Sequence, residues 1–481
     1  MSRRVARAPL LLMAALAGCM VGPDYERPDA PDAVTFKELA GWRPATPMDG
    51  IDASAWWSVY HDPLLDRLEA TIDVSSQTVR QAEAAYRAAA GEVGIARASL
   101  FPLIGASTGA SLQNGALGNF GGNATRTTYS AEPTASWDAD VWGRLRRLLE
   151  SATATAQVSA ADLANARLSV QIALATDYFA LRGADDLQRL LDQTVKQYQQ
   201  SLQVTQNQYD AGFAARSDVI TAQTLLESTR AQAINVGVAR GQYEHAIAVL
   251  AGLPPSALSI PPAGLPTKIA VPPATVPSAL LQRRPDIAAA ERVMAAQNAL
   301  IGVQVAAYYP DVSLSGLVGY VGNPLGSLVQ LSNRVWSLGA AAGQTLFSFG
   351  ARPAAVAAAE AGYDQAVAAY RQTVLTAFQQ VEDALSTLRI LQDQAVVEAR
   401  AVSLAQQAVT ITMNEYRAGT VAYTAVLAAQ ATALADEQAE ITIRAQRVQA
   451  SVALIGALGG GWDASALPTA QQLHQMNPLY P

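Results

Sequence analysis

Cysteine and histidine are scarce in this 481-residue chain, which holds one cysteine and three histidines. A single thiol cannot form a disulfide within the chain, and the three histidines are not spaced as a pair of metal ligands. The sequence also lacks a phosphate-binding loop and a Gly-x-Ser-x-Gly nucleophile elbow. We therefore expect neither catalysis nor a bound cofactor. The acidic pairs Asp185-Asp186 and Glu382-Asp383 are predicted to be solvated charge on polar helix faces.

Positive charge and long apolar runs are scarce as well. The formal net charge is −7, and it becomes −10 without residues 1–18, which hold three arginines and no acid. This charge argues against a nucleic-acid partner. Beyond those residues no run of 18 apolar residues occurs, so we expect no membrane-spanning helix, and any membrane span would have to be built from strands.

The amino terminus has the pattern of a secretory signal, with three arginines in the first seven residues and then the apolar run 9–16. The motif Leu16-Ala17-Gly18-Cys19 resembles the bacterial lipoprotein box, which implies cleavage before Cys19 and covalent lipid on that residue. Met20 stands where an aspartate would keep a lipoprotein in the inner membrane, so the resemblance favours the outer membrane. The alternative is an ordinary signal peptide with an incidental thiol.

Proline is missing from two long stretches, 134–253 and 354–467. Within them residues recur at steps of three and four, the heptad spacing of packed helices. The positions are Leu191, Val195, Tyr198, Leu202, Thr205 and Tyr209 in the first stretch and Val374, Phe378, Val381, Leu385 and Leu388 in the second. The spacing predicts a helix from about Asp140 to Tyr209, which would be about 100 Å long. A shorter helix is predicted over about 63–98, and Trp56 and Trp57 before it are predicted to pack in the core.

Two regions change to a period of two, which is typical of strands with one face against an apolar surround and the other against water. Residues 104–112 and 129–137 alternate in this way, and 312–320 with 336–342 repeat the hairpin. Four strands are too few to close a membrane barrel, and an open sheet edge is not tolerated in lipid. The hairpins must therefore be completed by other copies of the chain, in a number that strand physics leaves open.

The two hairpins belong to an internal duplication, in which residues 208–223 match 415–430 at an offset of 207 positions. Each unit is predicted to hold a helix, a hairpin, a very long helix, a tight turn and a further helix. The predicted divisions are a signal peptide 1–18, a lipid-anchored tether 19–62, a first repeat 63–253, a Pro-rich linker 254–277, a second repeat 278–460 and a tail 461–481.

The matched stretches each place a glycine where a helix must reverse within a few residues. Gly212 and Gly419 suit the left-handed backbone of such a turn. Tyr209 and Tyr416 can pack or hydrogen-bond across neighbouring helices.

Several short motifs in a fixed order resemble the outer-membrane factor family of tripartite efflux pumps, the TolC-like channels, and within it the lipoprotein branch close to NodT. They are Cys19 with Gly22-Pro23-Asp24-Tyr25, Trp56-Trp57 with Asp62-Pro63, Leu281 to Asp286, Tyr309-Pro310, Val381 to Leu385 and Ala457 to Trp462. The resemblance implies an α+β membrane protein with a long α-helical coiled-coil barrel. It also implies a homotrimer in which the four β-strands per chain complete a 12-stranded outer-membrane β-barrel. The implied partners are an inner-membrane efflux pump and a periplasmic adaptor protein.

In that architecture the two turns lie at the periplasmic tip, where the tunnel narrows and the adaptor docks. A purely structural role and a gating role are both open for the glycines and tyrosines of these turns. Relatives often carry acidic residues just after the second turn, but Ala425 and Ala428 stand at those positions here, whereas the first repeat keeps Asp218. We therefore expect no charged ring at the second repeat. Closure is expected to depend on packing at the tip and on Asp218, Arg216 and Arg417, although a helix-cap or surface role for Asp218 stays open.

The leading hypothesis is a passive trimeric exit duct for drugs or other small toxic solutes, powered by a partner. One alternative is an export duct for secreted proteins or polysaccharide, which the lipoprotein box and the segment from Leu281 to Asp286 disfavour. Another is a lipid-anchored periplasmic coiled-coil spacer, which would leave both hairpins in water.

Overall fold

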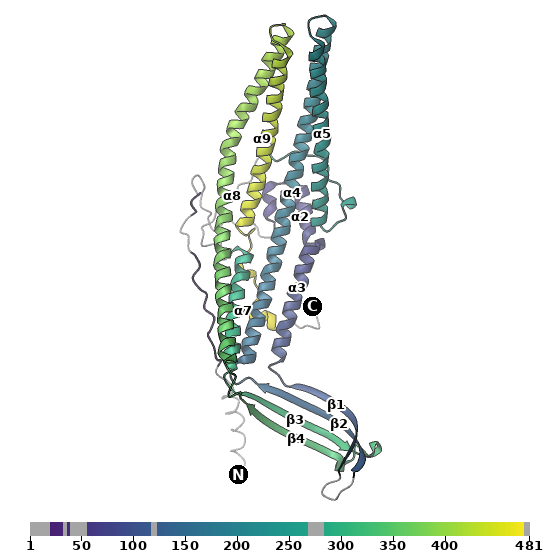
Figure 1. Ribbon diagram of the computed structural model, residues 1–481, viewed down its shortest axis with the longest axis vertical. Helices are drawn as coiled ribbons and strands as arrows, with labels where there is room; N and C mark the ends of the chain where they lie inside the picture. Colours follow the sequence, from purple (N-terminus) through teal and green to yellow (C-terminus); the bar gives the residue numbers. More distant parts are fainter. Residues whose placement is uncertain (1–19, 32–35, 39–54, 117–122, 268–282, 476–481) are drawn as a thin grey trace.

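The structure is a computed structural model, and it describes residues 20–31, 36–38, 55–116, 123–267 and 283–475. Its long axis runs from a four-stranded sheet at one end to two tight turns at the other, each of which joins a pair of long helices (Figure 1). A helical body lies between them. Cys19, the predicted lipid site, and parts of the predicted tether and linker lie outside the described residues.

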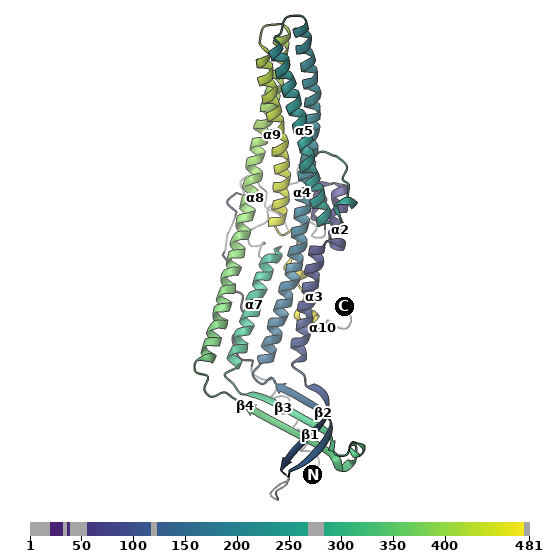
Figure 2. The same cartoon turned by 45° about the vertical axis from the view of Figure 1, so that its right-hand side comes forward.

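The body is built from three pairs of helices, and the two members of each pair are equal in length. The 67-residue helices are α4 (Arg144–Asp210) and α8 (Ala351–Arg417). The 35-residue helices are α5 (Arg216–Leu250) and α9 (Tyr423–Ala457), and the 22-residue helices are α3 (Gln77–Ala98) and α7 (Pro285–Ala306). The helical hairpins α4–α5 and α8–α9 lie side by side, while α3 and α7 fill the half nearer the sheet (Figures 1 and 2).

Helix α4 confirms the predicted long helix, with a length of about 100 Å at 1.5 Å per residue. It begins at Arg144 because the Asp140 carboxylate accepts hydrogen bonds from the free backbone N–H groups of Leu145, at 2.9 Å, and Arg146, at 3.0 Å. Satisfying these N–H groups stabilises the start of the helix.

The single helix predicted over 63–98 is wrong in one respect, because the chain breaks at Ser76. Helix α2 (Pro63–Ser75) ends there, Ser76 is extended with φ −60° and ψ 122°, and α3 starts after it. The Ser75 hydroxyl donates to the carbonyl of Ala251 at the end of α5. A tertiary contact thus accompanies the break, and the local sequence does not reveal it.

The strands form one antiparallel sheet in chain order, so the first and the last are its edges. They are β1 (Leu103–Ala116), β2 (Asn123–Ala139), β3 (Asp311–Gly322) and β4 (Arg334–Gly343). The register pairs Ile104 with Ala135, Ala135 with Gly316, and Gly316 with Leu338. Because paired residues share a face, the alternating apolar sets of all four strands lie on one side of the sheet. The other side carries mostly small and polar side chains, with Leu317, Val321 and Val335 among them.

Pro133 interrupts the ladder between β2 and β3. Pairing with β3 stops after Ala131 and resumes at Thr134, and proline has no N–H to donate. A Cβ on Gly319 in β3 would lie 2.4 Å from the carbonyl oxygen of Ala131. The two backbones therefore approach closely at this point, and only glycine fits.

The largest apolar cluster lies in the middle of the body, around the 3-10 helix η1 (Trp56–Tyr60). Trp56 and Trp57 are both buried, which confirms the predicted core packing, and the Trp56 indole N–H donates to Gln171 of α4 at 3.3 Å. None of the helices described here is long and apolar enough to cross a membrane. The short remaining elements are η3 (Pro255–Ala257), η4 (Leu325–Ser327), η5 (Leu331–Asn333), η6 (Ala464–Ala466) and α10 (Ala470–Gln475).

The prediction that Asp185 and Asp186 are solvated is wrong, because both are buried. Asp185 pairs with Arg182 at 3.2 Å and with Arg240 of α5 at 2.7 Å. Each carboxylate also accepts a backbone N–H of the segment after η3, Asp185 from Ala263 and Asp186 from Leu265, both at 3.0 Å. The two acids therefore fasten this segment to α4. The contact depends on how the chain folds back after η3.

Glu382 is likewise engaged rather than only solvated. Its two carboxylate oxygens accept the backbone N–H groups of Lys37, at 2.6 Å, and Glu38, at 3.0 Å. Arg389, about two turns further along α8, pairs with the Glu38 carboxylate at 2.7 Å. The amino-terminal segment is therefore fastened to α8 by charged groups.

The same amino-terminal segment also binds the first half of the chain. The buried Arg147 of α4 donates to the carbonyl of Gly22 at 3.2 Å and pairs with Asp24 at 2.9 Å. A Cβ on Gly22 would lie 2.4 Å from the Cα of Gly302 in α7, so these two backbones touch. Arg27 donates to the Tyr370 hydroxyl of α8 at 2.7 Å. One extended segment thus contacts helices of both repeats.

Candidate functional site

The two turns at the far end of the body share one hydrogen-bonding pattern. After α4, the N–H of Gly212 binds the carbonyl of Tyr209 at 2.9 Å, and the N–H of Phe213 binds that of Gln208 at 2.8 Å. Gly212 has φ +82°. These paired bonds around a left-handed glycine form a Schellman motif, which satisfies carbonyls that the helix end leaves free.

The second turn repeats this pattern after α8. The N–H of Gly419 binds the carbonyl of Tyr416 at 2.9 Å, the N–H of Thr420 binds that of Glu415 at 3.0 Å, and Gly419 has φ +75°. The predicted left-handed glycines are therefore present at both tips. This geometry accounts for a structural role of the glycines.

An aromatic cluster holds the two hairpins together near the tips. Tyr416 at the end of α8 and Tyr423 at the start of α9 are both buried, with ring centroids 5.2 Å apart. The Tyr423 hydroxyl lies 3.2 Å from the Ser201 hydroxyl of α4. Lower down, the Tyr198 hydroxyl donates to the carbonyl of Gln430 at 3.2 Å. The first repeat therefore contacts the second through tyrosine hydroxyls.

Tyr416 is buried with an unsatisfied group. Among the described residues its hydroxyl oxygen has no well-formed hydrogen bond, although Gln208 donates to its backbone carbonyl at 3.3 Å. Burial raises the pKa of the Tyr416 hydroxyl, the Thr205 hydroxyl opposes this, and the Asp218 carboxylate raises it further. Asp218 is thus within electrostatic reach of the buried tyrosine.

The other predicted tip residues are more exposed. Tyr209, Arg216 and Arg417 are exposed, and none of these three side chains forms a hydrogen bond or ion pair within the described part of the chain. Arg417 lines a groove of about 320 Å³ between α4 and the second hairpin. The structure therefore gathers Tyr416 and Asp218 around one cluster and leaves the two arginines at its rim.

Ala425 and Ala428 lie on α9 in the first two turns after the second tip, and Ala428 is exposed. Neither alanine can supply charge, so these two positions lack the acidic residues that relatives are expected to carry there. Sequence reasoning missed Tyr423 and Ser201, which form the clearest contact between the hairpins near the tip. The available signal was Tyr423, an aromatic residue just after the turn where the first repeat has Arg216.

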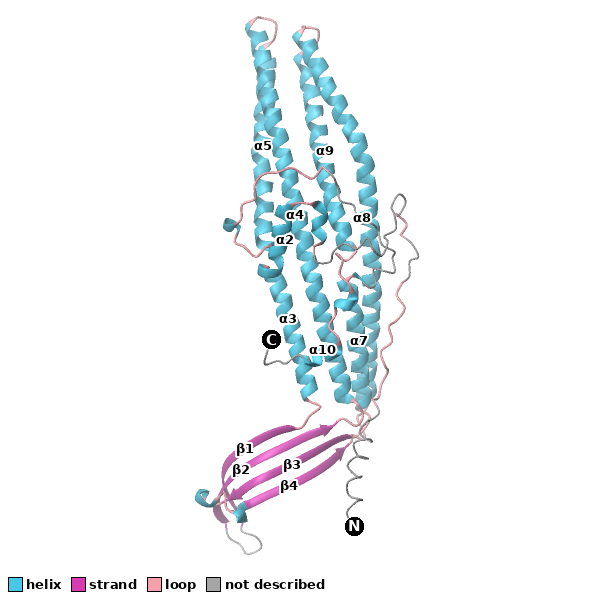
Figure 3. Ribbon diagram, turned by 180° about the vertical axis from the view of Figure 1, so that it is seen from behind, coloured by secondary structure: helices cyan, strands magenta, loops and turns pink. Residues whose placement is uncertain are grey.

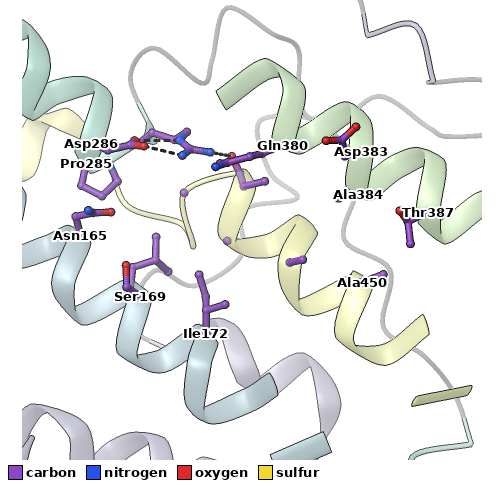
Figure 4. A pocket seen from close by; sticks show the side chains of 16 residues that line it. Asn165, Ser169, Ile172, Pro285, Asp286, Gln380, Asp383, Ala384, Thr387 and Ala450 are labelled. Atoms are coloured by element: carbon purple, nitrogen blue, oxygen red, sulfur yellow. Dashed lines mark hydrogen bonds and ion pairs between the residues drawn. The ribbon is translucent and has the colours of Figure 1, made fainter. Parts of the chain in front are cut away.

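A second hollow, of about 590 Å³, lies in the middle of the body where α4, α8 and α9 surround the start of α7 (Figure 4). Asn165 and Ser169 of α4 line it together with Gln380 and Asp383 of α8. The Asp286 carboxylate at its edge is held by Arg284 at 2.6 Å and 3.0 Å. In the described residues no group of three or more His, Cys, Asp or Glu is arranged to hold a metal ion.

The comparisons with known proteins agree with this architecture. The family model described as "Outer membrane efflux protein" matches residues 71–253 and 276–460. The chain is 30% identical over 483 residues to the probable efflux pump outer membrane protein TtgC of Pseudomonas putida, which covers 96% of this chain and 97% of that protein. It is also 30% identical to the outer membrane protein OprJ of Pseudomonas aeruginosa, with 94% of this chain and 95% of the relative covered.

A solved structure of the outer-membrane channel OprN superposes with a TM-score of 0.87 at 30% sequence identity, covering 92% of this chain and all of that one. A predominantly helical body with one four-stranded antiparallel sheet is the α+β fold of such channels. The chain belongs to the outer membrane efflux protein family.

Proposed function

We propose that this chain is the outer-membrane channel of a tripartite efflux pump, a passive exit duct for drugs or other small toxic solutes. The observation that carries the proposal is the four-stranded sheet, which has one apolar face and two edges that no described strand pairs, and which stands at the end of paired long helices. A sheet of this kind suits lipid on one side and water on the other.

The sheet edges argue for assembly. Among the strands of the described residues, β1 and β4 each have one partner, and their remaining N–H and C=O groups would be unpaired in lipid. Four strands from each of three copies would close one 12-stranded barrel and remove every edge. The helices would continue this barrel as a periplasmic tunnel with the tips at its far end.

The lipid anchor belongs to the same proposal. The backbone N–H of Val21 donates to the carbonyl of Trp142 at 3.1 Å, at the junction between β2 and α4. The next residue but one towards the amino terminus is Cys19, so lipid on Cys19 would leave the protein beside the sheet. Cys19→Ala is expected to abolish labelling by a fatty-acid analogue while the strands still span the membrane. Label that persists in this variant would exclude Cys19 as its site.

The tips are proposed to narrow the tunnel and to receive the adaptor protein. Because acids are missing at Ala425 and Ala428, closure would rest on packing around Tyr416, with Arg417 at the rim. Tyr416→Phe combined with Arg417→Ala is expected to raise the single-channel conductance of the isolated trimer, because the exposed Arg417 side chain, which has no partner in the described chain, would meet a neighbouring copy at the narrow tip. Asp218→Ala is expected to change ion selectivity more than conductance. Folded trimers of the double variant with unchanged conductance would remove this pair from the gate.

The names of relatives support a small-molecule cargo. One Pseudomonas putida relative is named a toluene efflux pump outer membrane protein, and another is named an antibiotic efflux pump outer membrane protein. By analogy this chain would work with an inner-membrane pump that supplies energy and a periplasmic adaptor. We find no feature of the described residues that favours proteins or polysaccharide as cargo.

Two measurements test the proposal. The purified, detergent-extracted protein is expected to conduct ions in planar bilayers, and its loss is expected to sensitise cells to small toxic solutes. A coiled-coil spacer anchored by lipid alone would not conduct, and it would be released in soluble form by Cys19→Ser. A folded trimer that does not conduct ions would contradict the proposal that the protein is a channel.

A further inference from the structure

The hollow in the middle of the body has a size that suits a bound organic molecule. Its volume is about 590 Å³, and α4 and α8 stand on opposite sides of it with the end of α9 between them (Figure 4). Hollows of about 300 to 1,000 Å³ are typical of sites for drug-sized ligands. The hollow is therefore large enough for a small solute of the kind that the proposed duct would carry.

The helix positions that line the hollow face away from the segments that cover α4 and α8. Ile172 lines it from α4 and lies about 160° round that helix from Leu174, which packs in the apolar cluster around η1. Gln380 lines it from α8 and lies about 160° round that helix from Glu382, which holds the amino-terminal segment. In the proposed tunnel the covering segments would lie outside the wall (Figure 3), so the hollow would open into the lumen.

The lining combines apolar surface with hydrogen-bonding groups. Its apolar part comes from α4 and α9 and includes Leu168, Ile172 and Ala453. Its neutral polar part comes from α4 and α8 and includes Asn165, Ser169 and Thr387. An aromatic ring could pack against the first set while its polar substituents form hydrogen bonds with the second. This mixture is typical of sites for small organic ligands.

The charged groups of the lining leave one carboxylate free. Arg284 donates to the Asp286 carboxylate at 2.6 Å and 3.0 Å and to the carbonyl of Ala457 at 2.9 Å, so this ion pair is satisfied internally. Asp383 of α8 is exposed, and among the described residues its only hydrogen bond is a contact of 3.4 Å from Gln379. The lining thus holds two carboxylates against one guanidinium, and Asp383 is the one available to a ligand.

We propose that this hollow binds amphiphilic organic cations on their way through the duct, with Asp383 as the residue that binds the cationic group. This rests on the proposed function and adds to it a class of cargo. A flat aromatic cation with amino substituents would pack against the apolar part of the lining and donate hydrogen bonds to the Asp383 carboxylate. An anion of similar size would be repelled by the same carboxylate.

Ethidium and fluorescein test this charge preference, because both are small aromatic dyes and they carry opposite charge. Fluorescence anisotropy of each dye with the purified trimer measures its affinity, and detergent without protein gives the background. The wild type is expected to bind ethidium more tightly than fluorescein. Asp383→Asn is expected to weaken ethidium binding about tenfold, because a hydrogen bond to a charged group is lost.

Asp393→Asn is the matched control, because Asp393 is an exposed acid of the same helix that does not line the hollow. It is expected to leave ethidium binding unchanged. Equal ethidium affinities for Asp383→Asn and the wild type, or an equal loss in Asp393→Asn, would overturn the assignment of Asp383.

Two further variants separate the charge of the hollow from its space. Ser169→Phe fills the hollow without a change of charge and is expected to weaken ethidium binding. Gln380→Glu adds a carboxylate to the lining and is expected to tighten it severalfold. Ethidium affinities that are unchanged in both variants would show that the dye binds elsewhere.

The site and the proposed function can fail separately. A wild-type trimer that conducts ions but binds no ethidium would overturn the site and leave the channel proposal intact. A folded trimer that does not conduct would instead count against the channel itself, whatever its affinity for ethidium.

Discussion

The turns at the tips and the turns in the middle of the body share one local design in very different surroundings. Gly212 and Gly419 end α4 and α8, and Gly252 and Gly459 end α5 and α9, all with positive φ and the same paired hydrogen bonds. A Cβ on either tip glycine would meet no atom within 4 Å. The same Cβ on Gly252 would lie 2.1 Å from the carbonyl oxygen of Ser75.

This difference shows that identical backbone conformation does not imply identical cost of substitution. At the tips, glycine is required only by the left-handed backbone conformation, which disfavours a side chain by about 1 kcal/mol. In the middle of the body, glycine also makes room for a neighbouring backbone that cannot move aside. The middle of the body is therefore expected to be rigid and sensitive to change, and the tips tolerant.

Gly459→Ala is expected to have the largest effect. Its Cβ would lie 1.9 Å from the carbonyl oxygen of Arg283, and overpacking adds to the backbone strain, so we expect a loss of several kcal/mol and little folded trimer. Yield and melting temperature of purified trimer measure it. Gly419→Ala is the matched control at the tip. Equal melting temperatures for the two variants would contradict the expected difference in sensitivity between the middle of the body and the tips.

Glu69, in the middle of the body, makes the stability of the folded chain depend on pH. It is fully buried, neither carboxylate oxygen has a hydrogen-bond partner in the described chain, and burial together with Asp73 raises its pKa from 4.5 to about 9. The folded chain keeps a proton that the unfolded chain loses, so this acid makes the free energy of unfolding fall as pH rises from about 5 to 9. The slope is up to about 1.4 kcal/mol per pH unit.

Glu69→Gln is expected to remove this dependence, because the amide is neutral in both states. Melting temperatures of wild type and variant across that pH range measure the effect, and the difference should grow towards high pH in favour of the variant. A wild-type slope that survives unchanged in the variant would assign the pH dependence to other groups.

Gly212→Ala and Gly419→Ala are expected to cost about 1 kcal/mol each, since only backbone strain opposes the new methyl group. Asparagine tolerates the left-handed region better than alanine, so Gly419→Asn is expected to cost less. Thermal unfolding of the trimer compares the three variants. A loss of several kcal/mol at either tip would mean that another copy packs against the turn.

Tyr416→Phe is expected to have the smallest effect on stability. The buried hydroxyl has no well-formed partner among the described residues, so removing it is expected to be neutral or to stabilise by up to about 1 kcal/mol. Thermal unfolding at neutral pH measures this, with Tyr423→Phe as the control because its hydroxyl lies 3.2 Å from that of Ser201. Greater loss in Tyr416→Phe than in Tyr423→Phe would reveal a partner from another copy.

Local patterns were sufficient wherever neighbouring residues decide the conformation. Alternation in the strands predicted one apolar face, and the register places those residues together across all four strands. Proline-free heptads predicted α4 over nearly its full length. The break at Ser76 was not predicted, because the neighbouring Ser75 contacts Ala251 at the end of α5, far along the chain.

The candidate site was predictable only in part. Gly212, Gly419 and Tyr416 followed from the duplicated turns, but the partnership of Tyr423 with Ser201 joins residues more than 200 positions apart. Asp185, Asp186 and Glu382 were assigned to solvent because a helix sequence alone does not show which segment crosses it. The structure covers them with residues 263–265 and 37–38.

The sequence by itself determined the duplication, the period of each element and the glycine at every reversal, because these depend on backbone conformation and on one residue's neighbours along the chain. The tertiary structure alone decided which glycines are crowded and which acids are buried. Those properties depend on atoms that approach from distant parts of the chain. Gly252 and Gly212 have the same φ region and the same hydrogen bonds, and only the position of Ser75 sets them apart.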